Sequence, residues 1–482
     1  MAGLCSILSK ENAAMLPLSL LLFDLFLIQG VSKDSLKKYF KILFLPIVII
    51  LFFGLIYMGS FSNAFGGWSI RDFTMGERLL TEPRIIIFYL TLLFYPVNSR
   101  LTLLYDIDIS HTLFHPWTTI PSILLIFFAI GFSFYFARKK PVISFCILFY
   151  FLNHAIEGSI FNLELIYEHR NYIPAMLLFV PVAIFFISSL NFFSARKILQ
   201  FSMAMVIIII IIGFGYNTYE RNTIFSNDFF LWRDNNEKYP NLSRTHSNLG
   251  NAYLNNNERA HALPEYEKAM SLNNFGGIYA RATQEHNLGA YKFFEGKYDE
   301  ALTYFESSNK ILPSYISNTI YIAKIHFLKN ESHIALDIIK GALKSSPFNS
   351  DLNKIFCIML LREEKFDEAE YFAKSILKNN LSNPFPLAVL AQTSKLKGNL
   401  KSAISLWKLY EQSYPSNASV NLALIELYFA VNDQEMLKKE TARLFCLKGQ
   451  KTLQNYIKAN LSAESFPIYI PDYASISKII KR

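Results

Sequence analysis

The residues best suited to chemistry form a polar cluster between two apolar runs of the sequence. Glu157 follows the first run, and Glu168, His169 and Arg170 precede the second. Ionisable side chains at the edge of a membrane are costly and mark a functional path by default. A carboxylate there could act as a general base, and the forked donors of Arg170 suit a phosphate. Glu157 and Glu168 are therefore candidate catalytic residues, and His169 and Arg170 are candidate ligands of a lipid phosphate.

The same cluster also has a structural interpretation. A buried glutamate–arginine pair would lock two helices together and would bind no ligand. Binding of an anionic lipid headgroup is the interpretation that we prefer, because His169 and Arg170 begin the second apolar run at the level of the phosphate groups. The sequence leaves both interpretations open.

A second group of ionisable residues lies between two earlier apolar runs. Asp106 and Asp108 form an Asp-x-Asp pattern, and His111 and His115 follow shortly after. Hard divalent cations take carboxylate oxygens, so this pattern is a candidate metal site. A solvated loop with local turn hydrogen bonds explains the same residues. We favour the loop, because the two aspartates alone make a short motif, and we assign no metal.

The apolar runs around these clusters predict a helical membrane region. A helix needs about 20 mostly apolar residues to cross a bilayer. Six segments meet or approach that length: 13–29, 40–59, 118–137, 141–157, 172–190 and 198–215. A seventh run, from Ile85 to Tyr95, lies between two prolines and is too short to cross. We expect it to form a re-entrant or interfacial helix.

Basic residues in the connecting loops predict the orientation of these spans. The 30–41 loop is rich in lysine, the 138–140 loop is Arg-Lys-Lys, and the 191–197 loop ends with Arg196 and Lys197. With six spans, the three loops fall on one side of the membrane, which the positive-inside rule makes cytoplasmic. Everything after residue 216 is then expected on the non-cytoplasmic side.

The composition agrees with a membrane part joined to a soluble part. Of the 482 residues, 52% are hydrophobic and 18% are charged, against about 25% charged in an ordinary soluble domain. These values exclude a single soluble globule, a disordered chain and a collagen-like fibre. Four cysteines are too few for a disulfide framework. The net charge of +9 includes the basic loops, and no aromatic-basic patch indicates nucleic-acid binding.

The soluble part is predicted to be a helical repeat array. Small residues recur at Ala262, Ala301, Ala335, Ala369 and Ala403, with spacings of 39, 34, 34 and 34 residues. A 34-residue period of paired helices is typical of tetratricopeptide (TPR) repeats. Gly250 and Gly289 supply a second small residue in the first two units. We predict that these small residues pack where the two helices of a hairpin cross closely.

The repeats and the apolar runs together predict an all-α chain. It would consist of a transmembrane domain over 1–216, a linker or capping helix over 217–240, about six TPR repeats over 241–450 and a C-terminal cap or tail over 451–482. Arrays of this kind present a concave groove, so we expect a protein or peptide partner. An array that only spaces or rigidifies the membrane part is the alternative.

Several motifs occur together in this chain. They are Tyr167-Glu168-His169-Arg170-Asn171-Tyr172-Ile173-Pro174, the upstream Ser9-Lys10-Glu11-Asn12, Leu80-Thr81-Glu82-Pro83-Arg84 and Asp106-Ile107-Asp108. With the repeats that follow, the chain resembles the transmembrane and TPR O-mannosyltransferase-like proteins and their bacterial relatives over nearly its whole length. The resemblance implies a GT-C-type membrane fold and a polyprenyl-phosphate-linked sugar as the donor, used on the non-cytoplasmic side.

The resemblance also implies roles for further residues. Lys10 and Arg84 join His169 and Arg170 as candidate ligands of the carrier phosphate. Members of the family carry their catalytic carboxylates in an outer loop that precedes the Ser-Lys-Glu-Asn motif by several helices. We therefore expect the catalytic outer loop to be missing from this polypeptide, and no residue here matches the catalytic aspartate.

Two functions follow from the sequence. The first is protein O-glycosylation from a polyprenyl-phosphate-linked sugar, in full or truncated form. The second is a non-catalytic, membrane-anchored TPR scaffold for protein–protein interaction. For both we expect an integral protein of a bacterial inner membrane, in contact with membrane lipid, with the array on the non-cytoplasmic side.

Overall fold

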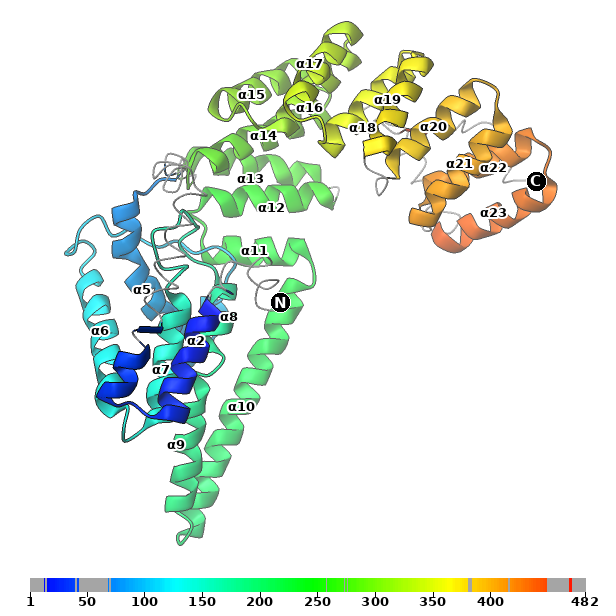
Figure 1. Ribbon diagram of the computed structural model, residues 1–482. Helices are drawn as coiled ribbons and strands as arrows, with labels where there is room; N and C mark the ends of the chain where they lie inside the picture. The colour runs from blue at the N-terminus through cyan, green and yellow to red at the C-terminus, as the bar shows by residue number, and fades with distance from the viewer. Residues whose placement is uncertain are drawn as a thin grey trace. The chain divides into compact units, whose positions relative to one another are not determined.

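The computed structural model describes residues 13, 15–39, 41–42, 68, 71–256, 258–272, 274, 276–379, 384–414, 417–448 and 468–469. Every regular element in these residues is a helix (Figure 1), which confirms the predicted all-α class. The chain divides into two compact units, Met1–Gln284 and Glu285–Arg482.

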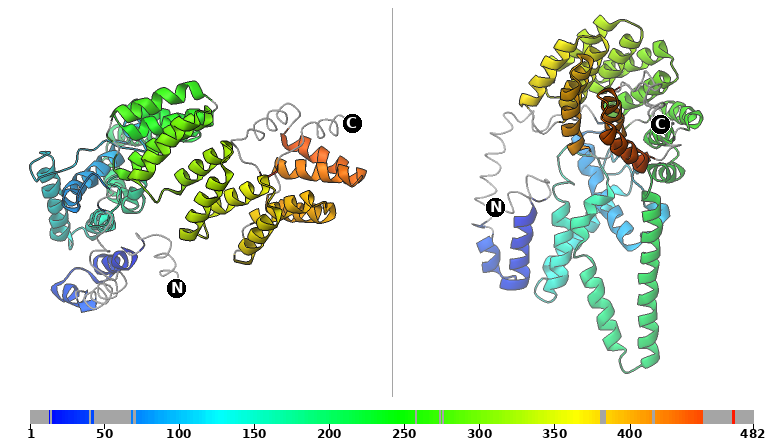
Figure 2. Two further views of the ribbon diagram at one scale, coloured as in Figure 1. Left: turned by 90° about the horizontal axis from the view of Figure 1, so that it is seen from above. Right: turned by 90° about the vertical axis from the view of Figure 1, so that its right-hand side faces the viewer.

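The first unit begins with helices of mostly apolar composition. They are α2 (Leu16–Phe23), η2 (Asp24–Gln29), α5 (Met75–Phe94), η4 (Asn98–Arg100), α6 (Thr119–Phe136), α7 (Pro141–His154), η5 (Glu168–Asn171), α8 (Tyr172–Ala175), α9 (Phe179–Phe192) and α10 (Lys197–Phe225). Within the described residues, α6 and α10 are long and apolar enough to cross a membrane. A third segment, η5–α8 with α9, is bent by 56°. Figure 2 shows α9 and α10 side by side, joined by a turn.

The prediction of six spans is therefore wrong. The predicted spans 118–137 and 198–215 correspond to α6 and α10, whereas 172–190 is broken between α8 and α9. The predicted spans 13–29 and 141–157 contain only short apolar helices, and the span 40–59 lies outside the described residues except for 41–42. An apolar run does not show where the backbone leaves the helix, as it does at Gly30 with a φ of 76°.

The predicted re-entrant helix over 85–95 is the second half of the longer helix α5. This helix starts at Met75 because Thr74 and Glu77 form a capping box, in which Glu77 N donates to the Thr74 hydroxyl at 3.2 Å and Thr74 N donates to the Glu77 carboxylate at 2.7 Å. Pro83 lies inside the helix and does not end it. The polar first half of α5 thus continues directly into its apolar second half.

Helix α11 (Asp228–Lys238) is followed by six helical hairpins in the described residues. They pair α12 (Ser243–Asn255) with α13 (Arg259–Leu272), α14 (Ile278–Phe294) with α15 (Tyr298–Ile311), α16 (Ile316–Leu328) with α17 (Ser332–Ser345), α18 (Ser350–Arg362) with α19 (Phe366–Asn379), α20 (Phe385–Leu396) with α21 (Leu400–Ser413), and α22 (Ala418–Ala430) with α23 (Gln434–Lys448). This is the predicted TPR-like α-solenoid. First helices also contact one another, α16 with α18 and α18 with α20, as the inner wall of a curved array requires.

The repeated alanines occupy the same point of each hairpin. Ala262, Ala301, Ala335, Ala369 and Ala403 are each the fourth residue of a second helix, and none has exposed surface. The turns from the second to the sixth hairpin each hold a residue with positive φ, namely Gly296, Asn330, Glu364, Gly398 and Asn432. A residue in this left-handed conformation ends the first helix and allows the chain to reverse.

Where the two helices of a hairpin cross, a small side chain on one helix faces a large one on the other, or two side chains of middle size face each other. Gly250 faces the ring of Tyr266, and Gly289 faces the ring of Phe305, so closely that a Cβ atom would lie 2.7 Å and 2.9 Å from the respective rings. At the equivalent positions of the fourth hairpin stand Cys357 and Ala373, both fully buried. A larger residue on the first helix is therefore matched by a smaller one on the second, as a close-packed core requires.

Candidate functional site

Glu157 and Arg170, two of the predicted site residues, form a buried ion pair. Arg170 Nε lies 3.3 Å from Glu157 Oε2, and both side chains are more than nine-tenths buried. Arg170 Nη1 also donates to the carbonyl oxygen of Glu164 and, at 3.4 Å, to that of Leu165. This geometry supports the structural interpretation of the cluster, because the guanidinium faces protein acceptors. The roles of Glu157 as a base and Arg170 as a phosphate ligand stay predictions.

Arg78 and Glu82 of α5 belong to the same buried cluster, although the sequence analysis assigned a role to neither of them. Arg78 has no exposed surface, and its Nη2 lies 2.6 Å from Glu82 Oε1. The guanidinium also donates to the carbonyl oxygens of Glu157 at 2.5 Å and Ser159 at 3.1 Å. Burial raises the pKa of Glu82 to about 8, against the opposing effect of Arg78 and Arg170. The i, i+4 spacing of Arg78 and Glu82 was the one feature of the sequence that could have predicted their ion pair.

Glu168 lies in a second polar network, together with Arg221 of α10. Glu168 Oε1 accepts a hydrogen bond from Thr102 N at 2.8 Å and one from the Tyr105 hydroxyl at 2.5 Å, and it lies 3.3 Å from Arg221 Nη2. Beside the network is a cavity of about 600 Å³, in which Arg221, Glu168 and His169 meet apolar side chains. The apolar part of the lining includes Leu93, Ala175, Met176 and Phe225.

Arg84 forms hydrogen bonds with the loop that contains Asp106 and Asp108, the candidate metal ligands. Its Nη1 donates to the carbonyl oxygen of Asp108 at 2.6 Å, and its Nε donates to the Thr118 hydroxyl at 2.8 Å. Asp106 and Asp108 are exposed. Among the described residues, no group of three or more possible ligands could hold a metal ion. Lys10, the remaining predicted phosphate ligand, lies outside the described residues.

A polar pocket of about 410 Å³ lies within the first unit, where the segment around Glu164 meets α12 and α14. Arg71 Nη1 lies 2.7 Å from Glu164 Oε1, and Arg244 Nη1 lies 3.5 Å from the same oxygen. Two guanidinium groups thus share one carboxylate, which leaves a net positive charge among the three. The rest of the lining carries mainly hydroxyl and amide groups, from Ser247, Asn248, Tyr279, Thr283 and Gln284. Such a lining suits an anionic or strongly polar group.

The sequence analysis did not connect the pocket residues with one another, for a physical reason. Arg71 precedes α5, Glu164 follows α7, and Arg244 lies in the first TPR hairpin. No spacing rule connects three segments this far apart in the chain, and only the fold brings them together. The position of Arg244 on a first helix was the one available signal, because first helices line the inner wall of such arrays.

No protein-family model matches this chain, and the comparison with curated proteins finds no relative. Solved TPR structures are similar to parts of it. A tetratricopeptide repeat protein from Parabacteroides merdae is 17% identical, with 50% of this chain and 97% of that chain covered and a TM-score of 0.35. Yeast Tom70 is 16% identical, with 65% and 64% covered and a TM-score of 0.42. YrrB, described as a TPR protein with an unusual peptide-binding site, is 15% identical, with 40% and 97% covered and a TM-score of 0.27.

Proposed function

We propose that this chain is a membrane-anchored TPR protein that binds a peptide segment of a partner protein on the non-cytoplasmic side. The observation that carries the proposal is the polar pocket around Arg71, Glu164 and Arg244. It joins the first helices of the array to a loop of the apolar region, and its charge suits a carboxylate of the partner. Binding of this kind needs no covalent step, so the proposal is the scaffold function of the two that the sequence suggests.

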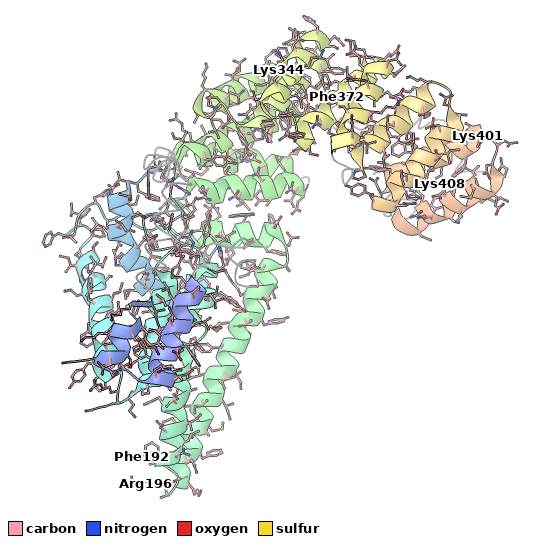
Figure 3. The ribbon with its side chains drawn as sticks, in the orientation of Figure 1. Phe192, Arg196, Lys344, Phe372, Lys401 and Lys408 are labelled. Carbon is pink, nitrogen blue, oxygen red and sulfur yellow. The ribbon has the colours of Figure 1, made fainter. Side chains whose placement is uncertain are left out.

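The exposure of the apolar helices supports the membrane anchor. In the most apolar stretch of α10 no residue is buried, and in that of α6 only 17% are. Such a surface is unfavourable in water, whereas lipid tails accept it. Phe192 and Arg196 lie at the turn between α9 and α10 (Figure 3), and Phe192 is 81% exposed. An aromatic and a basic residue at a helix end suit the interface of a membrane.

The basic loops support the orientation. Arg138 Nε donates to the carbonyl oxygen of Val31 at 3.0 Å, so the 138–140 loop adjoins the 30–41 loop. Two clusters of positive charge therefore lie on one side, where the positive-inside rule places the cytoplasm. Cys446 of α23 offers a test, because it is exposed while Cys146 and Cys357 are buried. In a Cys5→Ser background, a membrane-impermeant maleimide should label intact spheroplasts, and the further change Cys446→Ser should reduce this labelling strongly. Labelling only after lysis would contradict the orientation.

The pocket is tested with the purified full-length chain in detergent micelles and a library of synthetic peptides. We expect the wild type to enrich peptides with aspartate, glutamate or a free C-terminal carboxylate. The double variant Arg71→Gln/Arg244→Gln should lose this enrichment, because it removes both guanidinium groups. Arg259→Gln removes the charge of an exposed residue at the start of α13, outside the pocket, and this variant should bind as the wild type does. Unchanged enrichment in the double variant would contradict the proposal.

A second candidate function is the binding of a lipid phosphate in the cavity beside Arg221. The observation that favours it is the meeting of Arg221 and His169 with apolar side chains in one space of about 600 Å³. A phosphate attached to an acyl or polyprenyl chain needs both kinds of contact. The measurement is binding of a polyprenyl phosphate to the full-length chain, which Arg221→Ala should weaken at least tenfold. Equal binding by the variant would exclude this cavity.

Sugar transfer from such a carrier stays a prediction of the sequence resemblance. Glu157 and Glu168 both face arginine side chains, an arrangement that suits a structural role better than the abstraction of a proton. Release of a sugar from a polyprenyl-phosphate donor by the full-length chain, lost in Glu157→Gln or Glu168→Gln, is the result that would restore the enzymatic function.

A further inference from the structure

Two residues near the end of the chain, Ile468 and Tyr469, lie against the hairpins of the second unit. The side chain of Tyr469 is only 3% exposed, and it belongs to the same apolar core as residues of α20, α21, α22 and α23. Ile468 packs against this core and against the neighbouring core built mainly by α16 to α19. Ile468 and Tyr469 are therefore packed into the apolar cores of the array.

The residues around Tyr469 contact both the hydroxyl and the ring of its side chain. The Tyr469 hydroxyl lies 2.5 Å from Glu426 Oε2 and 3.3 Å from the carbonyl oxygen of Leu422. Lys395 Nζ lies 5.3 Å from the centre of the ring, within the range of a cation–π interaction. The ring of Trp407 stands edge-on, with centroids 6.3 Å apart. We call Lys395, Trp407, Leu422 and Glu426 the tyrosine site.

The tyrosine site does not depend on Tyr469 for its own charge balance. Lys395 Nζ lies 2.7 Å from Glu426 Oε1, so the two charged groups of the site are paired with each other. Tyr469 binds the second oxygen of the same carboxylate. Withdrawal of the tyrosine would therefore leave no isolated buried charge, and the site can stay formed without it.

The position of the tyrosine site distinguishes it from a cap of the array. A capping segment covers the free face of the last hairpin, and α22 and α23 form the last hairpin in the described residues. The recorded ring and polar contacts of Tyr469 are instead with α20, α21 and α22. Lys395 and Glu426 lie on first helices, the helices that line the inner wall of the array and on which peptides bind in such folds.

We propose that the tyrosine site is a binding site for a peptide with an aliphatic residue followed by tyrosine, and that the chain's own Ile468–Tyr469 occupies it in competition with such a ligand. The inference rests on the proposed function, because it takes peptide binding by the array as given. A ligand supplied in the same chain has an effective concentration in the millimolar range. An external peptide must therefore displace it, and binding of the partner is regulated by the C-terminal segment.

The test uses the full-length chain in detergent micelles and a fluorescent synthetic peptide with the sequence of residues 462–475. In this peptide Glu464→Gln, Asp472→Asn and an amidated C-terminus remove the carboxylates that the pocket around Arg71 and Arg244 would bind. The wild type should bind the peptide weakly, because its own tyrosine fills the site, and Tyr469→Ala should bind it at least tenfold more tightly. Tyr469→Phe keeps the ring and loses only the hydroxyl, so it should bind several-fold more tightly than the wild type even if the alanine variant folds poorly. Tyr371→Ala, a change of an exposed tyrosine on α19, should bind as the wild type does.

Two results would overturn the proposal. Equal affinity of the wild type and both Tyr469 variants would show that the chain's own segment does not fill the site. Absence of binding to the folded Tyr469→Phe variant would show that the site takes no peptide. Neither result affects the enrichment of acidic peptides through Arg71 and Arg244, so a failure here differs from a failure of the proposed function.

Discussion

Helix α10 and the hairpins of the second unit place the same kind of side chain in opposite environments. Ile209 of α10 is 63% exposed, whereas Ile325 of α16 has no exposed surface. From Met203 to Phe214 helix α10 carries no polar side chain, whereas in α16 Ile325 lies between Lys324 and His326. Hydrophobic content alone therefore does not say what surrounds a helix, while the spacing of the apolar residues does.

The largest effect is expected when a lysine replaces one of the two isoleucines compared above, Ile325 or Ile209. Ile325→Lys buries an ammonium group in the array and should unfold the second unit, with a loss of more than about 4 kcal/mol. Ile209→Lys should leave the melting of the array in detergent unchanged but reduce membrane insertion, at a cost of about 2.5 to 3.5 kcal/mol. Circular dichroism melts and carbonate extraction of membranes measure the two effects. A lower melting temperature of the array in Ile209→Lys would contradict the claim that Ile209 lies outside the packed core.

A smaller effect is expected from Gly289→Ala, which tests how closely the hairpins are packed. The added methyl group meets the ring of Phe305 at 2.9 Å, so we expect a loss of about 1 to 3 kcal/mol in the free energy of unfolding. Phe305→Leu in the same chain should restore part of the loss, because it makes room for the methyl group. Gly213→Ala in α10 is the matched control and should cause no loss, because an added Cβ atom there would meet nothing within 4 Å beyond the backbone of its own helix. Additive effects of the two changes at 289 and 305 would contradict direct contact.

Lys324 provides a pH-dependent test of the interior of the array. Burial, with the nearby charges of Lys354 and Arg362, lowers its pKa to about 8. Between this value and the ordinary value of 10.5, the unfolded chain holds a proton that the folded chain has lost, so stability rises with pH in that window. The gain should be about 1 kcal/mol between pH 7 and 9. Urea titrations that show the same pH slope for the wild type and Lys324→Met would argue against this assignment.

The smallest effect is expected at the turns between helices. Glu364 has a φ of 56°, a conformation that costs a residue with a side chain more than it costs glycine. Glu364→Gly should therefore stabilise the fourth hairpin by roughly 0.5 to 1 kcal/mol. Gly398→Ala, at the equivalent turn of the fifth hairpin with a φ of 82°, should destabilise by a similar amount. Thermal melts of the two variants that shift in the same direction would contradict this account.

The array could be predicted because each hairpin repeats the same local requirement. Ala335 and Ala369 must be small wherever two helices cross, and a 34-residue spacing preserves that requirement even where the glycines are lost. The turn at Gly398 could be predicted for the same reason, whereas Glu364 in the equivalent place could not, because its side chain gives no signal of a positive φ.

The breaks in the apolar helices and the candidate sites were less predictable. An apolar run does not reveal whether its helix is continuous, which is why the span at 172–190 was expected to be unbroken. The partners of the predicted residues also come from distant segments, as Arg78 does for the Glu157 loop and Arg221 does for Glu168. The place of Tyr469 depends on how the chain returns to α20 and α22, which no local pattern in the sequence encodes.

If α10 crosses a membrane as proposed, its length makes the contacts of its C-terminal end depend on the thickness of the bilayer. Its 29 residues measure about 44 Å at a rise of about 1.5 Å per residue, against a hydrocarbon core of about 30 Å. If α10 crosses as proposed, about nine residues stand above the lipid, among them Glu220, which accepts a hydrogen bond from Asn98, and Arg221, which pairs with Glu168. A thicker bilayer would pull these two contacts toward the headgroups, so the outer polar network is exposed to the mechanical state of the membrane.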